Sequence, residues 1–266
     1  MNLSGIKLVV SDMDGTLLNS SHEVSHLFFE LFREMKRKDI LFAAASGRQY
    51  SSIQEKLNPI KDDIIIIAEN GGFAMHKGKE IVSTPLHREI RNRVLSVLEG
   101  VVDIYPVLCG KNKAYIQTKS PFFIGKLSEY YTDFEILDDL RNFKGEIMKI
   151  AVYHHQDSET YIYPSVRQFE DELKVKVSGE NWVDLSHKDA HKGFALKKIQ
   201  EEYAISPSET LVFGDYNNDL EMMALSDYSV AMENAHPNVL SAARYRTLSN
   251  DSMGVERILQ KLVEGL

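Results

Sequence analysis

Asp12 and Asp14 stand two positions apart, after Ser11 and the strand-length run at residues 7–10 and before Gly15-Thr16. In an extended chain, residues two positions apart lie on the same side, so both carboxylates are expected to face one space. A carboxylate is already ionised at pH 7 and can attack an electrophile, while a second carboxylate can transfer the proton. The spacing predicts Asp12 as a nucleophile and Asp14 as the acid and base that serves it.

Further polar groups follow other apolar runs or open a helix. They are Ser46-Gly47-Arg48, Glu69-Asn70-Gly71-Gly72, Lys192-Gly193 and the set Asp215, Asn218 and Asp219. Open parallel sheets bind ligands outside the carboxyl ends of their strands, so these groups are expected to converge on one crevice. Carboxylates gathered in one crevice repel each other unless they share a cation. Hard oxygen ligands in a chain with a single cysteine favour Mg²⁺ as that cation.

The same crevice is predicted to hold a phosphate. A serine hydroxyl, backbone N–H groups at glycine turns and a lysine ammonium form a suitable cradle for it. Carboxylates with a metal on one side and phosphate donors on the other indicate phosphoryl transfer. Each motif taken alone is also typical of a turn or a helix cap, and it is the ordered set that supports this chemistry.

The elements that would position these groups follow from the apolar pattern. Apolar runs of strand length at 7–10, 40–46 and 63–69 alternate with segments of helical period, and residues 192–265 repeat the alternation, which predicts an α/β fold with a parallel sheet. In the middle third, strands are expected at 101–108, 113–118, 134–137, 146–153 and 174–178, and helices at 88–99, 121–130 and 158–172. We therefore predict a Rossmann-like core, residues 1–83 and 186–266, interrupted by an inserted α+β domain, residues 84–185.

Four short motifs, taken in order, resemble those of a known superfamily. They are Asp12-Met13-Asp14-Gly15-Thr16, Ser46-Gly47-Arg48, Lys192-Gly193 and Gly214-Asp215-Tyr216-Asn217-Asn218-Asp219. This order is similar to that of the haloacid dehalogenase (HAD) superfamily, and the insert resembles the type IIB cap of its Cof-type phosphatases. The resemblance covers essentially the whole chain. It implies a Mg²⁺-dependent phosphatase with an aspartyl-phosphate intermediate and a cap that sets specificity.

The resemblance also implies a role for each motif residue. Asp12 would be the nucleophile and Asp14 the acid and base. The implied metal ligands are Asp12, Asp14 through its backbone carbonyl, Asp215, and Asp219 at or just behind the metal. The implied phosphate-binding residues are Ser46, Lys192 and Asn218, with the backbone of Met13 and Gly47. The segment with Asn70 and Gly71 is expected near the substrate, and Arg48 would reach the substrate or pair with a carboxylate.

Two residues depart from the pattern of the superfamily. Glu233 stands where similar proteins often carry Gly. His191 precedes Lys192 at a position where similar proteins often carry Ser, Thr or Asn. Because those side chains are good N-caps, we expect the start of this helix to be less well capped.

Composition and charge narrow the class of partner. The chain has 31 basic and 39 acidic residues and a net charge of -8, which argues against a broad surface for nucleic acid or anionic membrane. Cys109 is the single cysteine, so an intrachain disulfide and a multi-cysteine zinc site are excluded. The N-terminal residues do not resemble a signal peptide, and no apolar stretch approaches a membrane span. We expect a cytoplasmic protein whose partner is a small phosphorylated metabolite, most simply a sugar phosphate.

Two alternatives remain open at this point. A phosphomutase of the same fold would keep the aspartyl-phosphate and pass the phosphoryl group to a second hydroxyl. A non-catalytic sensor of phosphorylated metabolites would keep the pocket without turnover. The pair Asp12 and Asp14 argues against the sensor, because binding alone needs no second catalytic carboxylate.

Overall fold

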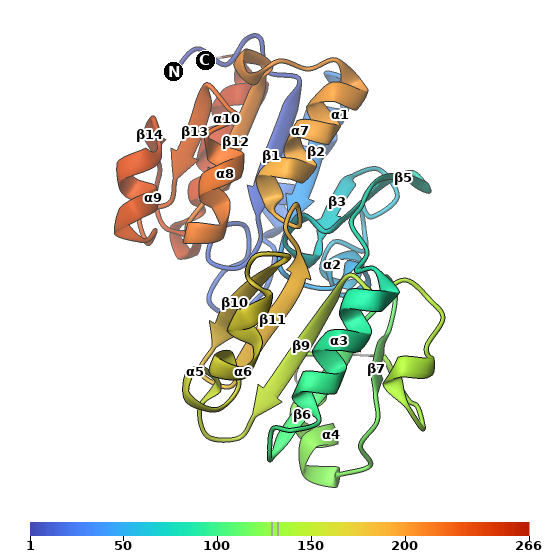
Figure 1. Ribbon diagram of the computed structural model, residues 1–266. Coiled ribbons are helices and arrows are strands. Elements are labelled where there is room, and N and C mark those ends of the chain that lie inside the picture. The colour runs from blue at the N-terminus through green and yellow to red at the C-terminus, as the bar shows by residue number, and fades with distance from the viewer. Residues whose placement is uncertain (129, 132, 266) are drawn as a thin grey trace. The chain divides into compact units, whose positions relative to one another are not determined.

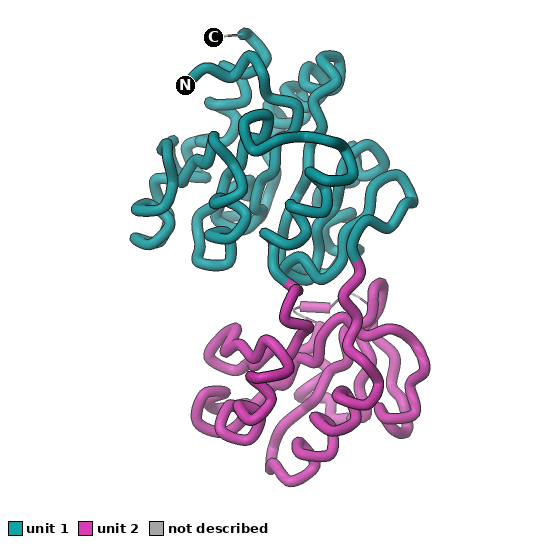
Figure 2. The backbone as a smooth tube through the Cα atoms, turned by 45° about the horizontal axis from the view of Figure 1, so that its top comes forward, with its two compact units in different colours: residues 1–82, 191–266 teal, residues 83–190 magenta. Residues whose placement is uncertain are grey.

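The computed structural model describes residues 1–128, 130–131 and 133–265. They form two compact units (Figure 2): residues 1–82 with 191–266, and residues 83–190. The predicted inserted domain, 84–185, lies within the second unit, which also includes residues 83 and 186–190. Strand β11 (Trp182–His187), which the apolar pattern did not predict, extends beyond position 185, because its pairing with the neighbouring strand runs to His187.

The first unit is built on an eight-stranded sheet in the order β14-β13-β12-β1-β2-β3-β4-β5 (Figure 1). Its strands are β1 (Leu8–Asp12), β2 (Leu41–Ala45), β3 (Ile65–Ala68), β4 (Phe73–His76), β5 (Lys79–Ser83), β12 (Thr210–Gly214), β13 (Tyr228–Ala231) and β14 (Tyr245–Arg246). The six strands from β14 to β3 pair in parallel, while β4 pairs antiparallel to β3. The predicted α/β class with a parallel sheet is therefore confirmed.

Helices accompany these strands. They are α1 (His26–Arg37), α2 (Tyr50–Lys56), α7 (Lys192–Tyr203), α8 (Leu220–Met223), α9 (Pro237–Ala242) and α10 (Gly254–Glu264), with the 3-10 turns η1 (Glu69–Gly71), η4 (Pro207–Glu209), η5 (Asn217–Asp219) and η6 (Asn250–Ser252). Helix α1 is typical: Ser25 caps it by accepting from the N–H of Phe28 at 3.1 Å, and Phe28 is fully buried. All five residues of β1 are buried, as expected for a central strand covered on both faces.

The second unit contains a six-stranded sheet in the order β10-β11-β9-β6-β7-β8. Its remaining strands are β6 (Ile104–Cys109), β7 (Ala114–Ile116), β8 (Phe134–Ile136), β9 (Lys149–His154) and β10 (Leu173–Gly179), and its helices are α3 (Arg88–Leu98), α4 (Pro121–Leu127), α5 (Ser158–Tyr161) and α6 (Tyr163–Val166), with the turns η2 (Leu140–Asn142) and η3 (Arg167–Phe169). The predicted hairpin is present, because β6 and β7 pair antiparallel. Of the helix expected at 121–130, position 129 lies outside the described residues.

The single helix expected over 158–172 is wrong. The segment is divided into α5, α6 and η3, and the break lies at Ile162, where φ is -104°. Pro164 explains the break, because proline has no N–H to donate to the carbonyl four residues earlier and its ring clashes with that carbonyl, whereas it is tolerated in the first turn of a new helix. Apolar periodicity alone did not reveal this interruption.

The Glu209 carboxylate in turn η4 is expected to stabilise the fold in a pH-dependent way. Its Glu209 accepts from the N–H and hydroxyl of Ser206 at 2.9 and 2.8 Å and pairs with Lys7. The Lys7 ammonium, followed by the Ser206 donors, lowers the pKa of Glu209 to about 2. The resulting stabilisation is present above the carboxyl group's ordinary pKa and is lost as the pH falls toward 2. We expect Glu209→Gln to reduce the pH dependence of the free energy of unfolding between pH 4.5 and 2, as measured by urea titration. A pH dependence equal to that of the parent would contradict this assignment.

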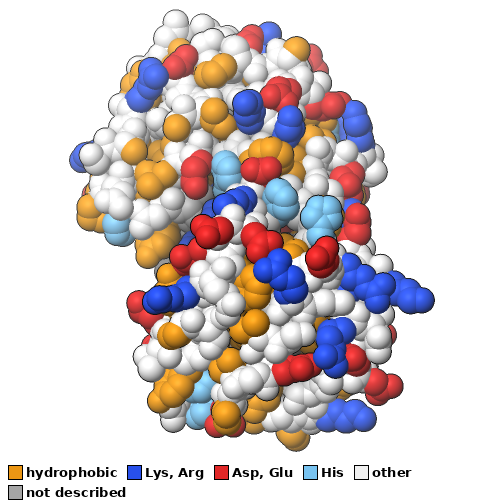
Figure 3. Space-filling model, viewed as in Figure 1, with side chains coloured by type: hydrophobic (Ala, Val, Ile, Leu, Met, Phe, Trp, Pro, Cys, Tyr) orange, Lys and Arg blue, Asp and Glu red, His pale blue; other side chains and the backbone are white. Residues whose placement is uncertain are grey.

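None of the helices in the described ranges has the length and apolar character needed to cross a bilayer. Acidic and basic side chains are interspersed on the face of each unit that Figure 3 displays. This mixed pattern agrees with the modest net charge of -8.

Candidate active site

The carboxyl ends of four neighbouring strands carry the predicted site residues. Strands β12, β1, β2 and β3 are consecutive in the sheet of the first unit and run parallel. Asp12 ends β1, the Ser46 loop follows β2, η1 follows β3, and the Asp215 loop follows β12. The topology therefore places these polar turns side by side at one edge of the sheet.

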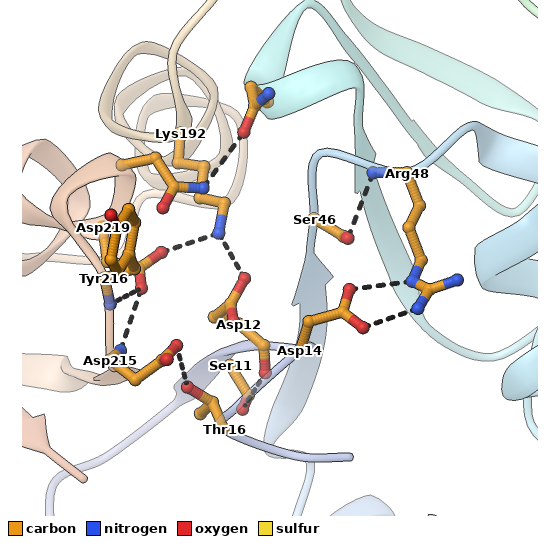
Figure 4. Close-up of polar contacts among 12 residues, drawn as sticks. Ser11, Asp12, Asp14, Thr16, Ser46, Arg48, Lys192, Asp215, Tyr216 and Asp219 are labelled. Carbon is orange, nitrogen blue, oxygen red and sulfur yellow. Dashed lines mark hydrogen bonds and ion pairs between the residues drawn. The ribbon is translucent and has the colours of Figure 1, made fainter. Parts of the chain in front are cut away.

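A buried lysine lies at the centre of the site. Lys192, the first residue of α7, is fully buried, and its Nζ donates to carboxylate oxygens of both Asp12 and Asp219 (Figure 4). The bond to Asp219 is 2.6 Å long. Because a lysine at this depth needs charged partners, the two carboxylates account for its burial. Lys192 thus joins the start of α7 to the end of β1 and to turn η5.

Asp219 is held by its own loop, and Asp215 is held by residues of the first motif. Asp219 Oδ2 accepts from the backbone N–H groups of Asp215 and Tyr216 at 3.0 and 3.1 Å. Thr16 Oγ1 donates to Asp215 at 3.0 Å, and Gly15, with φ of +79°, lies directly against that carboxylate. A Cβ at Gly15 would overlap Asp215, so glycine is required by both the backbone geometry and the close approach.

The electrostatics of the cluster favour a bound cation. Burial raises the pKa of Asp12 well above its usual value, the Lys192 charge opposes this, and the carboxylates of Asp219 and Asp215 raise it further. Burial and the charge of Asp219 also raise the pKa of Asp215. Lys192 keeps a raised pKa, because the charges of Asp12 and Asp219 outweigh the effect of its burial. One ammonium therefore faces three carboxylates, and an additional cation would relieve the remaining repulsion.

The donor set fits a hard divalent metal. One oxygen each from Asp12, Asp215 and Asp219 lies within 4.8 Å of the others. Carboxylate oxygens are the preferred ligands of such ions. The carboxylate of Asp14 is not part of this group, although the sequence also named Asp14 as a ligand through its backbone carbonyl.

Asp14 is instead paired with Arg48. The guanidinium donates to both carboxylate oxygens, with Arg48 Nε at 2.8 Å from Asp14 Oδ2. Burial alone would raise the pKa of Asp14, but the hydrogen bond and charge of Arg48, together with His22, lower it overall. Of the two roles that the sequence left open for Arg48, the structure displays the carboxylate pairing. The pair is partly exposed, so a ligand at the site can reach it.

The predicted phosphate-binding residues surround the same space. Figure 4 shows Ser46 between Lys192 and the Arg48–Asp14 pair, and Ser46 Oγ accepts from the N–H of Arg48 at 3.1 Å. Asn218 Nδ2 donates to Asn70 Oδ1 at 3.1 Å. Met13 is fully buried after β1, and its carbonyl accepts from the N–H of Leu18 at 2.8 Å. The structure thus brings the predicted groups together, while their individual roles stay predictions.

Two features of the site were not expected. Sequence reasoning gave no role to Thr16, although it belongs to the first motif, and here it orients Asp215. The expected weak cap of α7 is wrong, because His191 Nδ1 accepts from the N–H of Phe194 at 3.1 Å. An imidazole nitrogen is therefore the N-cap acceptor, in place of the usual hydroxyl or carboxamide oxygen.

Comparison with known proteins agrees with this geometry. Residues 9–259 match the family of haloacid dehalogenase-like hydrolases. The chain belongs to that family. It is 31% identical to the 5-amino-6-(5-phospho-D-ribitylamino)uracil phosphatase of Escherichia coli strain K12, over 97% of each chain.

Solved structures share the fold. A protein of Streptococcus mutans UA159 superposes with a TM-score of 0.84 at 26% identity, covering 97% of this chain and 99% of that one. A HAD subclass IIB sugar phosphatase superposes with a TM-score of 0.78 at 19% identity, covering 96% and 98%. Together these likenesses support a Cof-type HAD phosphatase, an enzyme that acts on phosphoric monoesters.

Proposed function

We propose that this HAD phosphatase hydrolyses small phosphorylated metabolites, sugar phosphates above all, through an aspartyl-phosphate at Asp12 with Mg²⁺ bound. The observation that carries the proposal is the position of the Asp12 carboxylate. One of its oxygens accepts from buried Lys192, and the carboxylate belongs to the Asp12, Asp215 and Asp219 cluster. An attacking oxygen is thus placed where cations would hold a phosphate dianion.

Asp12, Asp215 and Asp219 would hold Mg²⁺ together with the carbonyl of Asp14. The bound ion would neutralise carboxylate repulsion and polarise a phosphoryl oxygen. Lys192 and the side chains of Ser46 and Asn218 would bind the other phosphoryl oxygens, with the N–H groups of Met13 and Gly47. Each of these donors opposes the charge that the transferring group spreads over its oxygens.

Asp12 and Asp14 would divide the covalent work. Asp12 attacks phosphorus and forms the aspartyl-phosphate while the bond to the leaving oxygen breaks, and Asp14 protonates that oxygen. Asp14, now ionised, takes a proton from water, whose oxygen attacks phosphorus and releases Asp12 and inorganic phosphate. Arg48 must release Asp14 for the first of these proton transfers, since the ion pair favours the ionised carboxylate.

Residues 84–185 would select the leaving group. This assignment rests on the family resemblance, in which the inserted domain sets specificity. The name of the Escherichia coli relative adds a ribityl phosphate bearing a pyrimidine to the sugar phosphates already expected. A substrate panel therefore needs both plain sugar phosphates and sugar phosphates that carry a heterocycle.

The function is tested by inorganic phosphate release from that panel with Mg²⁺ and with EDTA. We expect release that depends on Mg²⁺ and is greatest for one class of sugar phosphate. Isomerised esters without free phosphate would indicate a mutase instead. Binding of the esters without any turnover would contradict the proposal and favour a sensor.

Metal binding has a separate stability signature. Mg²⁺ is expected to bind the cluster in the folded protein and not the unfolded chain. At a Mg²⁺ concentration 100 times the dissociation constant, it should therefore raise the free energy of unfolding by about 2.7 kcal/mol. Asp215→Asn removes one ligand and should abolish most of that gain. Asp227→Asn is the matched control, because Asp227 pairs with Arg244 on the surface, away from the cluster. Equal Mg²⁺ responses in both variants, measured by thermal unfolding, would place the metal elsewhere.

A further inference from the structure

We propose that Asn70 is a positioning residue that orients the phosphate-binding amide of Asn218 and does not itself contact the substrate. This inference deepens the proposed function and rests on it. The sequence placed Asn70 near the substrate, whereas its contacts in the structure are with residues of two other motifs. The effect of Asn70 on turnover would therefore pass through Asn218.

The backbone at Asn70 is held in an unusual conformation. Glu69, Asn70 and Gly71 have φ of +50°, +55° and +95°, three consecutive residues in the left-handed region. Asparagine tolerates this region better than other residues with a Cβ. The N–H of Asn70 donates to the carbonyl of Ser46 at 2.9 Å, and the N–H of Glu69 donates to the carbonyl of Arg48 at 3.0 Å. Turn η1 is thereby bonded to the loop that follows β2.

The Asn70 side chain joins that loop to the Asp215 loop. Its Oδ1 accepts from Asn218 Nδ2 at 3.1 Å. The same amide lies against Gly47, where a Cβ would stand 3.1 Å from Asn70 Nδ2. One side chain therefore touches two of the residues predicted to bind phosphate, Gly47 and Asn218.

This contact fixes which end of the Asn218 amide serves as the donor. A terminal amide carries an oxygen acceptor at one end and two N–H donors at the other, and the two ends exchange by a half turn. With Asn70 Oδ1 as acceptor, the NH₂ end is held in place and keeps a second hydrogen for a phosphate oxygen. Without that acceptor, the carbonyl end of Asn218 could turn toward the phosphate and repel it.

Turn η1 also constrains the third motif. Gly71 packs directly against the carbonyl of His191, the cap residue of α7, and a Cβ at Gly71 would overlap it. Since Lys192 follows His191, the turn that carries Asn70 abuts the start of the helix that carries the buried lysine. A substitution at position 70 must therefore preserve the left-handed backbone if it is to test the side chain alone.

Asn70→Gly meets that requirement, because glycine adopts positive φ without strain and lacks only the amide. The test is a double-mutant cycle of Asn70→Gly and Asn218→Ala, read as kcat/KM for the best ester and as inhibition by inorganic phosphate. We expect Asn70→Gly to lower kcat/KM and weaken phosphate inhibition by about tenfold, the size of one hydrogen bond to a charged group. The double variant should be no worse than Asn218→Ala alone. Asn58→Gly, at an exposed position of the same unit, is the control and should change neither constant.

Three results would overturn the inference. If the losses of kcat/KM from the two substitutions multiply in the double variant, Asn70 contacts the substrate independently of Asn218. An unchanged phosphate inhibition in Asn70→Gly would mean that the amide has no role in phosphate binding. A parent enzyme that hydrolyses no ester would overturn the proposed function itself, and this inference with it. Asn70→Ala distinguishes backbone strain from loss of the amide. It also lacks the amide, but its Cβ is strained at positive φ, so its melting temperature should be lower than that of Asn70→Gly.

Discussion

Replacing Asp12 by Asn is expected to reduce phosphate release by about 10⁴-fold or more. The amide is a poor nucleophile, and the neighbouring carboxylates are engaged elsewhere: Asp14 is paired with Arg48, Asp215 accepts from Thr16, and Asp219 is fully buried and bonded to Lys192. The residual rate should come from binding and electrostatic stabilisation alone. Phosphate release under saturating ester measures this loss, with Asp227→Asn as a variant that should keep full activity.

The same substitution should not unfold the protein. In the metal-free enzyme, burial and the neighbouring carboxylates raise the pKa of Asp12, so its ionised form destabilises the folded state. A group whose folded pKa is raised in this way loses stability as the pH rises above its unfolded pKa. Asp12→Asn removes that loss, and we expect a melting temperature equal to or above that of the parent at pH 7 in EDTA. A large decrease would mean that Asp12 mainly supports the fold.

Lys192→Met is expected to have the largest effect on stability. The ammonium is fully buried and is hydrogen-bonded to Asp12 and Asp219, so its removal leaves buried negative charge without a partner. Loss of the ammonium, the cation that these buried carboxylates share, costs about 3–5 kcal/mol. Turnover should also fall sharply, because a cation that opposes phosphoryl charge is lost.

Helix α7 offers a matched control for this variant. Lys198 lies on the same helix, but its Nζ pairs with Glu201 at the surface. Lys198→Met should change the free energy of unfolding by less than about 1 kcal/mol. Mg²⁺ should restore part of the stability lost in Lys192→Met, whereas it should stabilise Lys198→Met by the same amount as the parent. Equal urea midpoints for the two variants would contradict the central position that we assign to Lys192.

The elements that carry the site could be predicted because their signals are strong. A buried parallel strand appears in the sequence as a short apolar run. Strands β1 and β12 coincide with such runs and end at Asp12 and Gly214. Helix α7 begins at Lys192, the residue that was predicted to open a helix. Open parallel sheets gather ligands at one edge, so strand ends alone were enough to nominate the residues of the cluster.

Other elements were missed because their signals are short or conflicting. Strands β4 and β5 flank a turn of Lys77 and Gly78, both with positive φ, but four and five residues give little periodicity. The break at Pro164 has a local cause that the apolar pattern of 158–172 conceals. Contacts between side chains distant in sequence, such as Arg48 with Asp14, depend on packing that periodicity does not encode.

The covalent route through Asp12 is tested most directly by trapping the intermediate. Asp14→Asn removes the base for the second step, and an aryl phosphate has a leaving group that needs no proton, so phosphoryl-enzyme should accumulate in this variant. After mixing with Mg²⁺ and acid quenching, peptide mass spectrometry should place one phosphoryl group on Asp12. The double variant Asp12→Asn with Asp14→Asn should carry none. Continued release of phosphate by a protein that lacks Asp12, with no phosphorylated peptide in either variant, would contradict the account.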